Sequence, residues 1–233
     1  FVTGSVGVAD RACRSLAAAS RWVVASVEYR LAPETAFPGP LHDCVSTVRW
    51  LTAHSEAIGG DASTTVIAGD SAGGALATAC STVLRDLGDA VPSGQILIYP
   101  TLGPIGSRTS ESIRAYGDLP SLTRGSIDWF WSHYVPGSEA DPDPHAAPLR
   151  QQVLAGLPDT TVVAAGCDLL RDDAIVYTSR LSSAGVGTRL HVVEGAIHGF
   201  WWMDGVLGQA AELTELLAED LRDRAEGRWQ PSQ

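Results

Sequence analysis

The feature that most constrains this chain is a regular alternation of short apolar, β-branched runs with longer amphipathic segments. Such alternation is typical of βαβ units, in which helices cover both faces of a parallel sheet. We expect strands at residues 22–28, 64–68, 95–99, 161–165 and 189–193. We expect helices at residues 8–19, 41–54, 72–87, 173–184 and 208–225. The sequence therefore predicts an α/β fold with a mainly parallel sheet flanked by helices.

A chain of 233 residues is long enough to bury one large core, so we expect residues 1–233 to form a single domain. Residues 101–149 interrupt the alternation, because they are rich in Pro, Gly and Ser and contain one aromatic helical segment at 126–134. An insertion after a strand is typical of a lid or cap over a site. An ordinary irregular crossover would have the same composition, and that alternative stays open.

Charge and cysteine usage exclude several classes of partner. The net charge is -11 and no basic run exists, which argues against nucleic acid as a partner. No stretch of eighteen apolar residues and no basic-then-apolar leader occur, so we expect a cytoplasmic protein without a membrane span. The cysteines are far apart and show no metal-binding spacing, which predicts buried free thiols and no metal site (Cys13, Cys44, Cys80 and Cys167).

One serine lies between glycines at a predicted junction of strand and helix, in the stretch VIAGDSAGGA at residues 66–75. The pattern is GxSxG around Ser71, in which a nucleophile on a strained turn needs small neighbours, here Gly69 and Gly73. A serine at a helix start also has backbone N–H groups nearby, including that of Ala72, which can stabilise an oxyanion. We therefore expect Ser71 to be a nucleophile.

A serine hydroxyl is a weak nucleophile near neutral pH, so it needs a base and an acid that orients the base. Among the histidines, His198 follows the last predicted strand, and active sites of open α/β sheets are built at the carboxyl ends of strands. The other histidines lie inside a predicted strand, on a helix or in the insertion (His42, His54, His133, His145 and His191). His198 is therefore the predicted base.

The acid should follow the preceding strand, and Asp168 occupies that position. Asp172 and Asp173 are rivals, although they lie where a helix begins and are explained by capping and by the helix dipole. The resulting order, Ser71, Asp168 and His198, is that of the α/β-hydrolases and differs from that of trypsin-like and subtilisin-like enzymes.

With these residues assembled, the chain resembles the hormone-sensitive-lipase family of bacterial esterases, a branch of the α/β-hydrolases. The motifs that carry the resemblance are VEYRLAPE with FPGPLHDC (27–44), GDSAGG (69–74), AGCDLLRDD (165–173) and EGAIHGF (194–200). The resemblance implies the α/β-hydrolase fold with a cap insertion. It also implies a nucleophile elbow formed around the serine by Gly69, Asp70, Gly73 and Gly74, in which Asp70 has a structural role.

The front of the chain departs from the family pattern. Family members carry a His-Gly-Gly-Gly motif just before the segment that resembles FVTGS, and glycine amides of that motif help to hold the oxyanion. The printed sequence begins at Phe1 without it, so we expect the remaining oxyanion donors upstream of Phe1 and an incomplete or truncated form. The loss of one such donor costs on the order of 10²–10³ in rate.

Aromatic residues near the predicted site are candidates for an acyl pocket. Phe200 and Trp201 follow the predicted base, and Phe1 follows the expected position of the oxyanion motif. We predict that these three residues line the substrate pocket. Large aromatic rings are mostly buried for packing, so a purely structural role remains equally open.

The leading functional hypothesis is hydrolysis of a small ester with a short- to medium-chain acyl group, through an acyl-enzyme and without a metal or organic cofactor. An acyltransferase or an N-deacetylase would use the same residues. A non-catalytic small-molecule receptor, as in the plant gibberellin receptors that resemble this family, is a further alternative. Such receptors typically lose the catalytic histidine, whereas His198 is present here. Related enzymes often pair, so a homodimer is a possible assembly.

Overall fold

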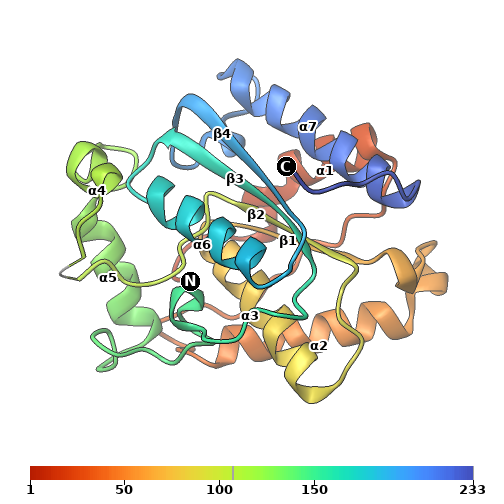
Figure 1. Cartoon of the computed structure of the whole chain (residues 1–233), viewed down its shortest axis with the longest axis horizontal. Helices are drawn as coiled ribbons and strands as arrows, with labels where there is room; N and C mark the ends of the chain where they lie inside the picture. Colours follow the sequence, from red (N-terminus) through yellow and green to blue (C-terminus); the bar gives the residue numbers. More distant parts are fainter. Residues whose placement is uncertain (107, 233) are drawn as a thin grey trace.

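The computed structural model describes residues 1–106 and 108–232, and it contains a four-stranded sheet in the order β1-β2-β3-β4 (Figure 1). Every neighbouring pair is parallel. The strands are β1 (Val66–Asp70), β2 (Gly94–Ile98), β3 (Asp159–Cys167) and β4 (Thr188–Ile197). The predicted α/β fold with a parallel sheet flanked by helices is thus confirmed. Residue 107 of the predicted insertion and residue 233 of the predicted domain lie outside the described residues.

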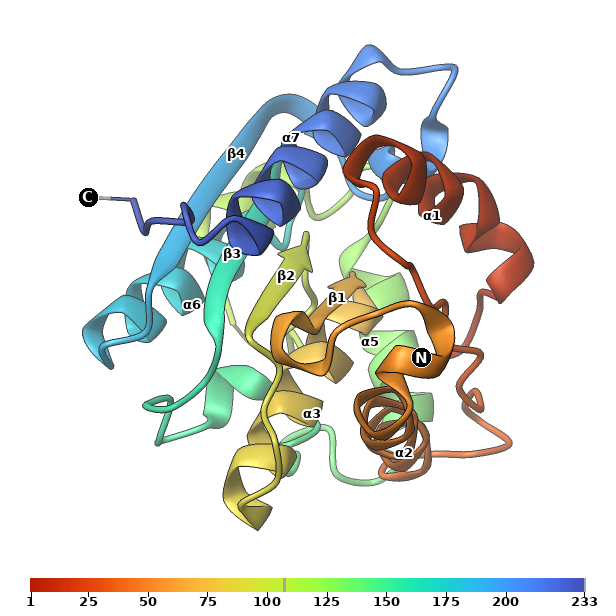
Figure 2. The same cartoon turned by 90° about the vertical axis from the view of Figure 1, so that its right-hand side faces the viewer.

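Helices cover both faces of this sheet (Figure 2). One face carries α3 (Ala72–Leu87) and α6 (Arg171–Ser183), while the opposite face carries α1 (Val6–Ser20) and α7 (Gly208–Ala225). A further helix, α2 (Gly39–Ala53), packs against α3. The short 3-10 helices are η1 (Ser55–Ile58), η2 (Ala62–Thr64), η3 (Pro148–Arg150) and η4 (Phe200–Met203).

The side chains of the central strands divide the core into two layers. Ile96 and Ile98 of β2 belong to the cluster with α1 and α7, whereas Leu97 belongs to the cluster with α3 and α6. Val163 and Val162 of β3 divide in the same way. Successive side chains of a strand point to opposite faces, so a nearly continuous apolar run is buried on both sides.

The predicted strand at residues 22–28 is wrong. These residues form neither strand nor helix, and β1 ends the sheet at one edge. The segment has the β-branched composition of a strand, but a strand also needs a neighbour to complete its ladder of hydrogen bonds. Among the described residues, none pairs with this segment in a sheet.

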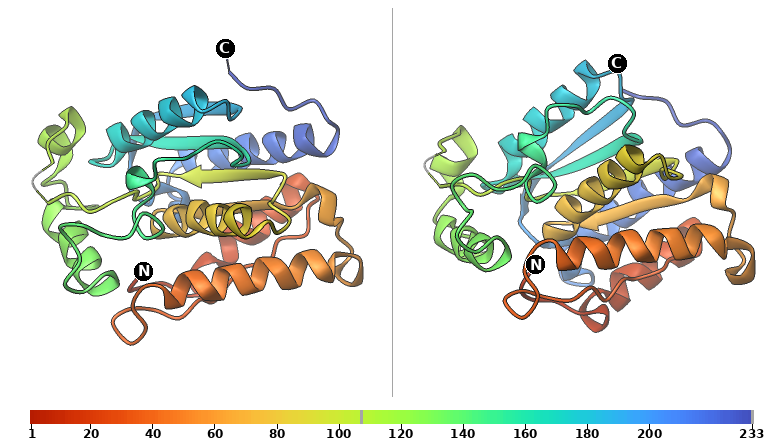
Figure 3. Two further views of the ribbon diagram at one scale, coloured as in Figure 1. Left: turned by 60° about the horizontal axis from the view of Figure 1, so that its bottom comes forward. Right: turned by 90° about the horizontal axis from the view of Figure 1, so that it is seen from below.

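The insertion at residues 101–149 contains α4 (Glu111–Tyr116) and α5 (Arg124–Tyr134) and lies on the side toward which the strands point (Figure 3). Helix α5 confirms the aromatic helix predicted at 126–134, and it begins slightly earlier because Thr123 and Ser126 form a capping box. The six-residue helix α4 was not predicted, because so short a segment has no clear periodicity. A lid role for the insertion stays a prediction.

Two further expectations concern the membrane and the thiols. In the part of the chain that the structure describes, no helix has the length and apolarity needed to cross a bilayer. The four cysteines are free thiols, of which Cys80 is fully buried and the other three are partly exposed.

Candidate active site

The predicted nucleophile lies on a strained turn. Ser71 follows β1 directly and precedes α3, with φ of 49° and ψ of -114°, a conformation that residues with a side chain rarely adopt. Hydrogen bonds hold the turn, since the Ser71 N–H donates to the carbonyl of Ile98 (2.9 Å) and the Thr101 N–H donates to the carbonyl of Ser71 (3.1 Å). The serine hydroxyl is therefore held at the carboxyl end of the sheet.

The glycines of this turn differ in how much space surrounds them. A Cβ atom on Gly69 would lie 2.1 Å from the carbonyl oxygen of Gly73, and one on Gly74 would lie 2.6 Å from Cβ of Pro100. A Cβ atom on Gly73 would meet nothing closer than Oδ1 of Asp70, at 3.9 Å. Close packing thus requires glycine at positions 69 and 74. The expectation that Gly73 is needed to avoid a clash is wrong, because a Cβ atom there would make only an ordinary van der Waals contact.

Three side chains from three strand ends meet at Ser71. His198 follows β4, and its Nε2 lies 2.9 Å from Oγ of Ser71. Asp168 follows β3, and its Oδ2 lies 2.6 Å from Nδ1 of His198. If Nδ1 carries the proton and donates it to the carboxylate, Nε2 keeps the lone pair that can accept the serine proton. The predicted nucleophile, base and acid thus form one hydrogen-bonded chain.

The carboxyl group of Asp168 is removed from solvent and fixed from a second direction. Its side chain is fully buried, and its Oδ1 accepts a hydrogen bond from the N–H of Leu170 (2.9 Å). The His198 side chain keeps 11% of its surface exposed. A buried carboxylate with both oxygens hydrogen-bonded is well suited to orient an imidazole.

Tyr99 closes one side of the imidazole. Its ring centroid lies 4.9 Å from that of His198 and 5.7 Å from that of Phe200. The pKa of Tyr99 is raised well above its ordinary value, first by burial and then by the negative charges of Asp70 and Asp168. Tyr99 therefore packs against the histidine as a neutral ring.

The rival acids lie outside this chain of hydrogen bonds. Asp172 accepts a hydrogen bond from the N–H of Ser112 (2.9 Å), and Asp173 accepts one from Arg108 (2.7 Å). Burial raises the pKa of Asp173, and the neighbouring guanidinium of Arg108 opposes that shift. Both acids lie in the first turn of α6, as predicted, and they also attach the insertion to that helix. Ser112 and Arg108 were missed, because nothing in the sequence links positions so far apart.

The predicted pocket residues lie in the core. Phe1 is buried and its ring stacks on Tyr134, with centroids 3.9 Å apart. Phe200 and Trp201 are also buried, and the indole N–H of Trp201 donates to Oγ1 of Thr214 (3.1 Å). A lining role for Phe1, Phe200 and Trp201 stays a prediction.

The predicted oxyanion donor lies beside the predicted nucleophile. Ala72 is the first residue of α3. The first N–H groups of a helix have no acceptor within the helix, and they carry partial positive charge. This position suits a donor to a developing oxyanion, and that role of Ala72 stays a prediction.

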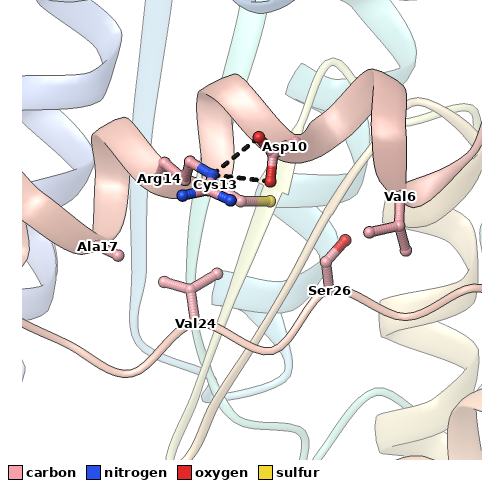
Figure 4. Close-up of a pocket in the computed structure, with 7 residues that line it drawn as sticks. All are labelled: Val6, Asp10, Cys13, Arg14, Ala17, Val24 and Ser26. Atoms are coloured by element: carbon pink, nitrogen blue, oxygen red, sulfur yellow. Dashed lines mark hydrogen bonds and ion pairs between the residues drawn. The ribbon is translucent and has the colours of Figure 1, made fainter.

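A cleft of about 200 Å³ lies elsewhere, between α1 and the segment that follows it (Figure 4). The residues that line it are Val6, Asp10, Cys13, Arg14, Ala17, Val24 and Ser26. Arg14 is paired with Asp10, and burial raises the pKa of the Cys13 thiol, which disfavours the nucleophilic thiolate. No member of the hydrogen-bonded chain around Ser71 lines this cleft.

Sequence comparisons relate most of the chain to known proteins. A family described as having the alpha/beta hydrolase fold matches residues 1–202. Esterase LipI of Mycobacterium tuberculosis is 35% identical over 217 residues, which are 92% of this chain and 67% of that protein. Ethyl acetate hydrolase of Pseudomonas putida is 33% identical over 225 residues, which are 95% of this chain and 70% of that protein. The chain thus spans about two thirds of the length of these relatives.

Solved structures show the same similarity. A hyperthermophilic esterase from the archaeon Pyrobaculum calidifontis superposes with a TM-score of 0.90 at 34% identity, covering 95% of this chain and 73% of that one. The esterase LipW from Mycobacterium marinum superposes with a TM-score of 0.89 at 32% identity, covering 97% of this chain and 70% of that one.

Proposed function

Because this chain belongs to the α/β-hydrolase-fold family, in its hormone-sensitive-lipase branch of carboxylesterase-type hydrolases, we propose that it cleaves small carboxylic esters through an acyl-enzyme on Ser71. The observation that carries the proposal is the continuous hydrogen-bonded chain from Oγ of Ser71 through His198 to Asp168. This arrangement matches the chemical need of a serine nucleophile for a base and an oriented acid.

In the first half of the proposed reaction, Oγ of Ser71 attacks the ester carbonyl carbon while Nε2 of His198 takes the hydroxyl proton. The carbonyl electron pair moves to oxygen, and the N–H of Ala72 is the donor proposed for that oxyanion. The tetrahedral intermediate then collapses, and the leaving alkoxide receives the proton from the imidazolium. Asp168 stabilises the imidazolium and keeps the ring in the required orientation.

In the second half, a water molecule attacks the acyl-enzyme. Nε2 of His198 takes a proton from this water and returns it to Oγ of Ser71 when the carboxylic acid leaves. Both halves use Ser71 and His198. In the first half the proton leaves Oγ of Ser71 for His198, and in the second half His198 returns a proton to Oγ.

We propose esters of short- to medium-chain acids as substrates. A relative that acts on ethyl acetate, by its name, supports a small acyl group. Phe1, Phe200 and Trp201, whose rings are buried, are the residues predicted to line the substrate pocket.

The test is covalent labelling by a fluorophosphonate together with turnover of p-nitrophenyl butyrate. We expect one label on Ser71, found by peptide mass spectrometry, and loss of both labelling and turnover in Ser71→Ala, with kcat lower by roughly 10⁴-fold or more. Ser182→Ala is the matched control, because Ser182 is an exposed serine on α6 away from the site. A Ser71→Ala protein that keeps wild-type turnover would refute the acyl-enzyme. Added alcohol or amine separates hydrolysis from acyl transfer through the products formed.

A further inference from the structure

A second hydrogen bond joins the turn around Ser71 (residues 69–74, the nucleophile turn) to the segment that follows His198. Asp70 is the last residue of β1 and directly precedes Ser71, while Trp202 lies in η4, the turn that follows His198. The indole N–H of Trp202 donates to Oδ2 of Asp70 over 2.8 Å. The two sides of the site are thus connected by a bond between neighbours of the reacting residues as well as by the bond between Ser71 and His198.

The position of Asp70 makes this bond costly to lose. Burial raises the pKa of the Asp70 carboxyl group, and the hydrogen bond from Trp202 and the charge of His198 oppose that shift. Asp70 is only partly exposed, so its carboxyl group gains from a donor inside the protein, and Trp202 supplies one. Removal of the indole N–H would leave the Oδ2 atom of Asp70 without this partner.

The turn that carries Trp202 is held at both sides. Trp201 donates to Oγ1 of Thr214 on α7, and Trp202 donates to Asp70 at the end of β1. Gly199, between His198 and this turn, has φ of 78°, a conformation that glycine adopts readily. The two indoles therefore hold the segment after His198 between α7 and the nucleophile turn.

Asp70 has no place in the proton transfer itself. Nδ1 of His198 is hydrogen-bonded to Asp168 and Nε2 to Ser71, so both ring nitrogens already have partners. Asp70 makes no hydrogen bond to the imidazole, and its side-chain hydrogen bond goes to Trp202, in the turn that follows His198. This arrangement separates a positioning role from that of a catalytic acid.

We propose that Asp70 is a positioning residue: by holding the indole of Trp202, it keeps the imidazole of His198 within hydrogen-bonding distance of Ser71. This inference rests on the hydrolysis proposed above, because it concerns the geometry of the same site. The hydrogen-bond acceptor at position 70 is the property that matters, since a neutral amide oxygen can accept from an indole N–H as a carboxylate does.

The experiment compares Asp70→Ala, Trp202→Phe, their double variant and Asp70→Asn in p-nitrophenyl butyrate kinetics. Each single loss of the bond should lower kcat roughly tenfold with KM within about twofold, because misplacement of a catalytic group slows chemistry more than binding. The double variant should be no slower than either single variant, since one shared contact is lost. Asp70→Asn should stay within about threefold of wild type, because its amide oxygen can accept the bond.

Trp229→Phe is the matched control. The indole N–H of Trp229 donates to Oδ1 of Asp220 over the same 2.8 Å, in a contact apart from the catalytic residues. This variant loses an equivalent bond between tryptophan and aspartate, and its kcat should equal that of wild type. Far-UV circular dichroism and a thermal melt show whether each variant is folded.

Two results would overturn the positioning role. One is a wild-type kcat in both Asp70→Ala and Trp202→Phe, and the other is a double variant in which the two losses multiply. If Asp70→Ala does not fold, Trp202→Phe and Asp70→Asn still test the positioning role. A large loss of kcat in Asp70→Asn would contradict the role of the hydrogen-bond acceptor at position 70. An active Ser71→Ala protein, by contrast, would refute the acyl-enzyme and so separates the failure of the two proposals.

Discussion

Gly69→Ala should reduce both stability and activity, because the nucleophile turn has no space for one more methyl group. The added Cβ would lie 2.1 Å from the carbonyl oxygen and 2.2 Å from the carbonyl carbon of Gly73. Non-bonded carbon atoms pack best at about 3.5–4.0 Å, so the backbone must open by more than about 1 Å. Overpacking of this kind costs about 1–3 kcal/mol, and we expect a loss near the upper end because backbone atoms must move.

The same displacement should slow the reaction. Ser71 lies between Gly69 and Gly73, so opening this turn moves Oγ relative to His198. A misplacement of about 1 Å can lower the rate roughly 10²-fold. We therefore expect kcat/KM to fall about 10²-fold in Gly69→Ala, with the free energy of unfolding lower by about 3 kcal/mol.

Gly73→Ala is the matched control, since it adds the same methyl group to the same turn. Its Cβ would meet no heavy atom closer than 3.9 Å, and the residue lies in the first turn of α3. Alanine is favoured over glycine within a helix by up to about 1 kcal/mol, so this variant should be at least as stable as wild type.

Urea denaturation followed by tryptophan fluorescence measures the stability of both variants, and p-nitrophenyl butyrate turnover measures activity. The steric reasoning would be refuted if Gly69→Ala unfolded at the wild-type urea concentration and kept wild-type kcat/KM. Equal losses in Gly69→Ala and Gly73→Ala would also refute it, because the space around the two positions differs.

The remaining predictions concern the acid, two thiols of raised pKa and one half-buried imidazole. Asp168→Asn should lower kcat by roughly 10⁴-fold in steady-state kinetics, as in serine proteases that lose this carboxylate, whereas Asp172→Asn should have a far smaller effect. Burial raises the pKa of the Cys44 and Cys80 thiols from 9.0 to about 12. Iodoacetamide near pH 8 should therefore modify these thiols about 10³-fold more slowly than in the unfolded chain. Mass spectrometry measures the two rates of modification, and equal rates would contradict the prediction. Burial lowers the pKa of His191 from 6.5, so below that value the folded state binds fewer protons than the unfolded state and the free energy of unfolding decreases as the pH falls. His191→Asn should flatten this decrease in urea titrations between about pH 7.5 and about pH 5.5, and an unchanged slope would argue against it.

The meeting of the three predicted site residues could be foreseen because parallel topology restricts where such residues can lie. Every strand of a parallel sheet delivers its carboxyl end to the same edge, so Ser71, Asp168 and His198 needed only to follow different strands. Their separation along the chain did not matter. Periodicity alone located the strands they follow, and the structure places each of the three directly after one.

The predicted strand at residues 22–28 shows where local composition is insufficient. β-Branched residues favour an extended backbone, but membership of a sheet depends on a partner elsewhere in the chain. The structure keeps this segment outside the sheet and leaves β1 at the edge. A short-range pattern could not reveal this outcome, because it contains no information about which strands are neighbours.

The contacts that support the site were harder to predict than the site itself, and the reason is chemical. A serine nucleophile requires an imidazole and a carboxylate, so few residues qualify for each role. Asp70 requires only some donor, and the one it meets, Trp202, is 132 residues away along the chain. Many side chains could have met that need equally well, and only the folded loops select one of them. Reacting groups can thus be predicted from a sequence because their chemistry admits few residue types. The residues that position those groups must be found from coordinates and tested by paired substitutions.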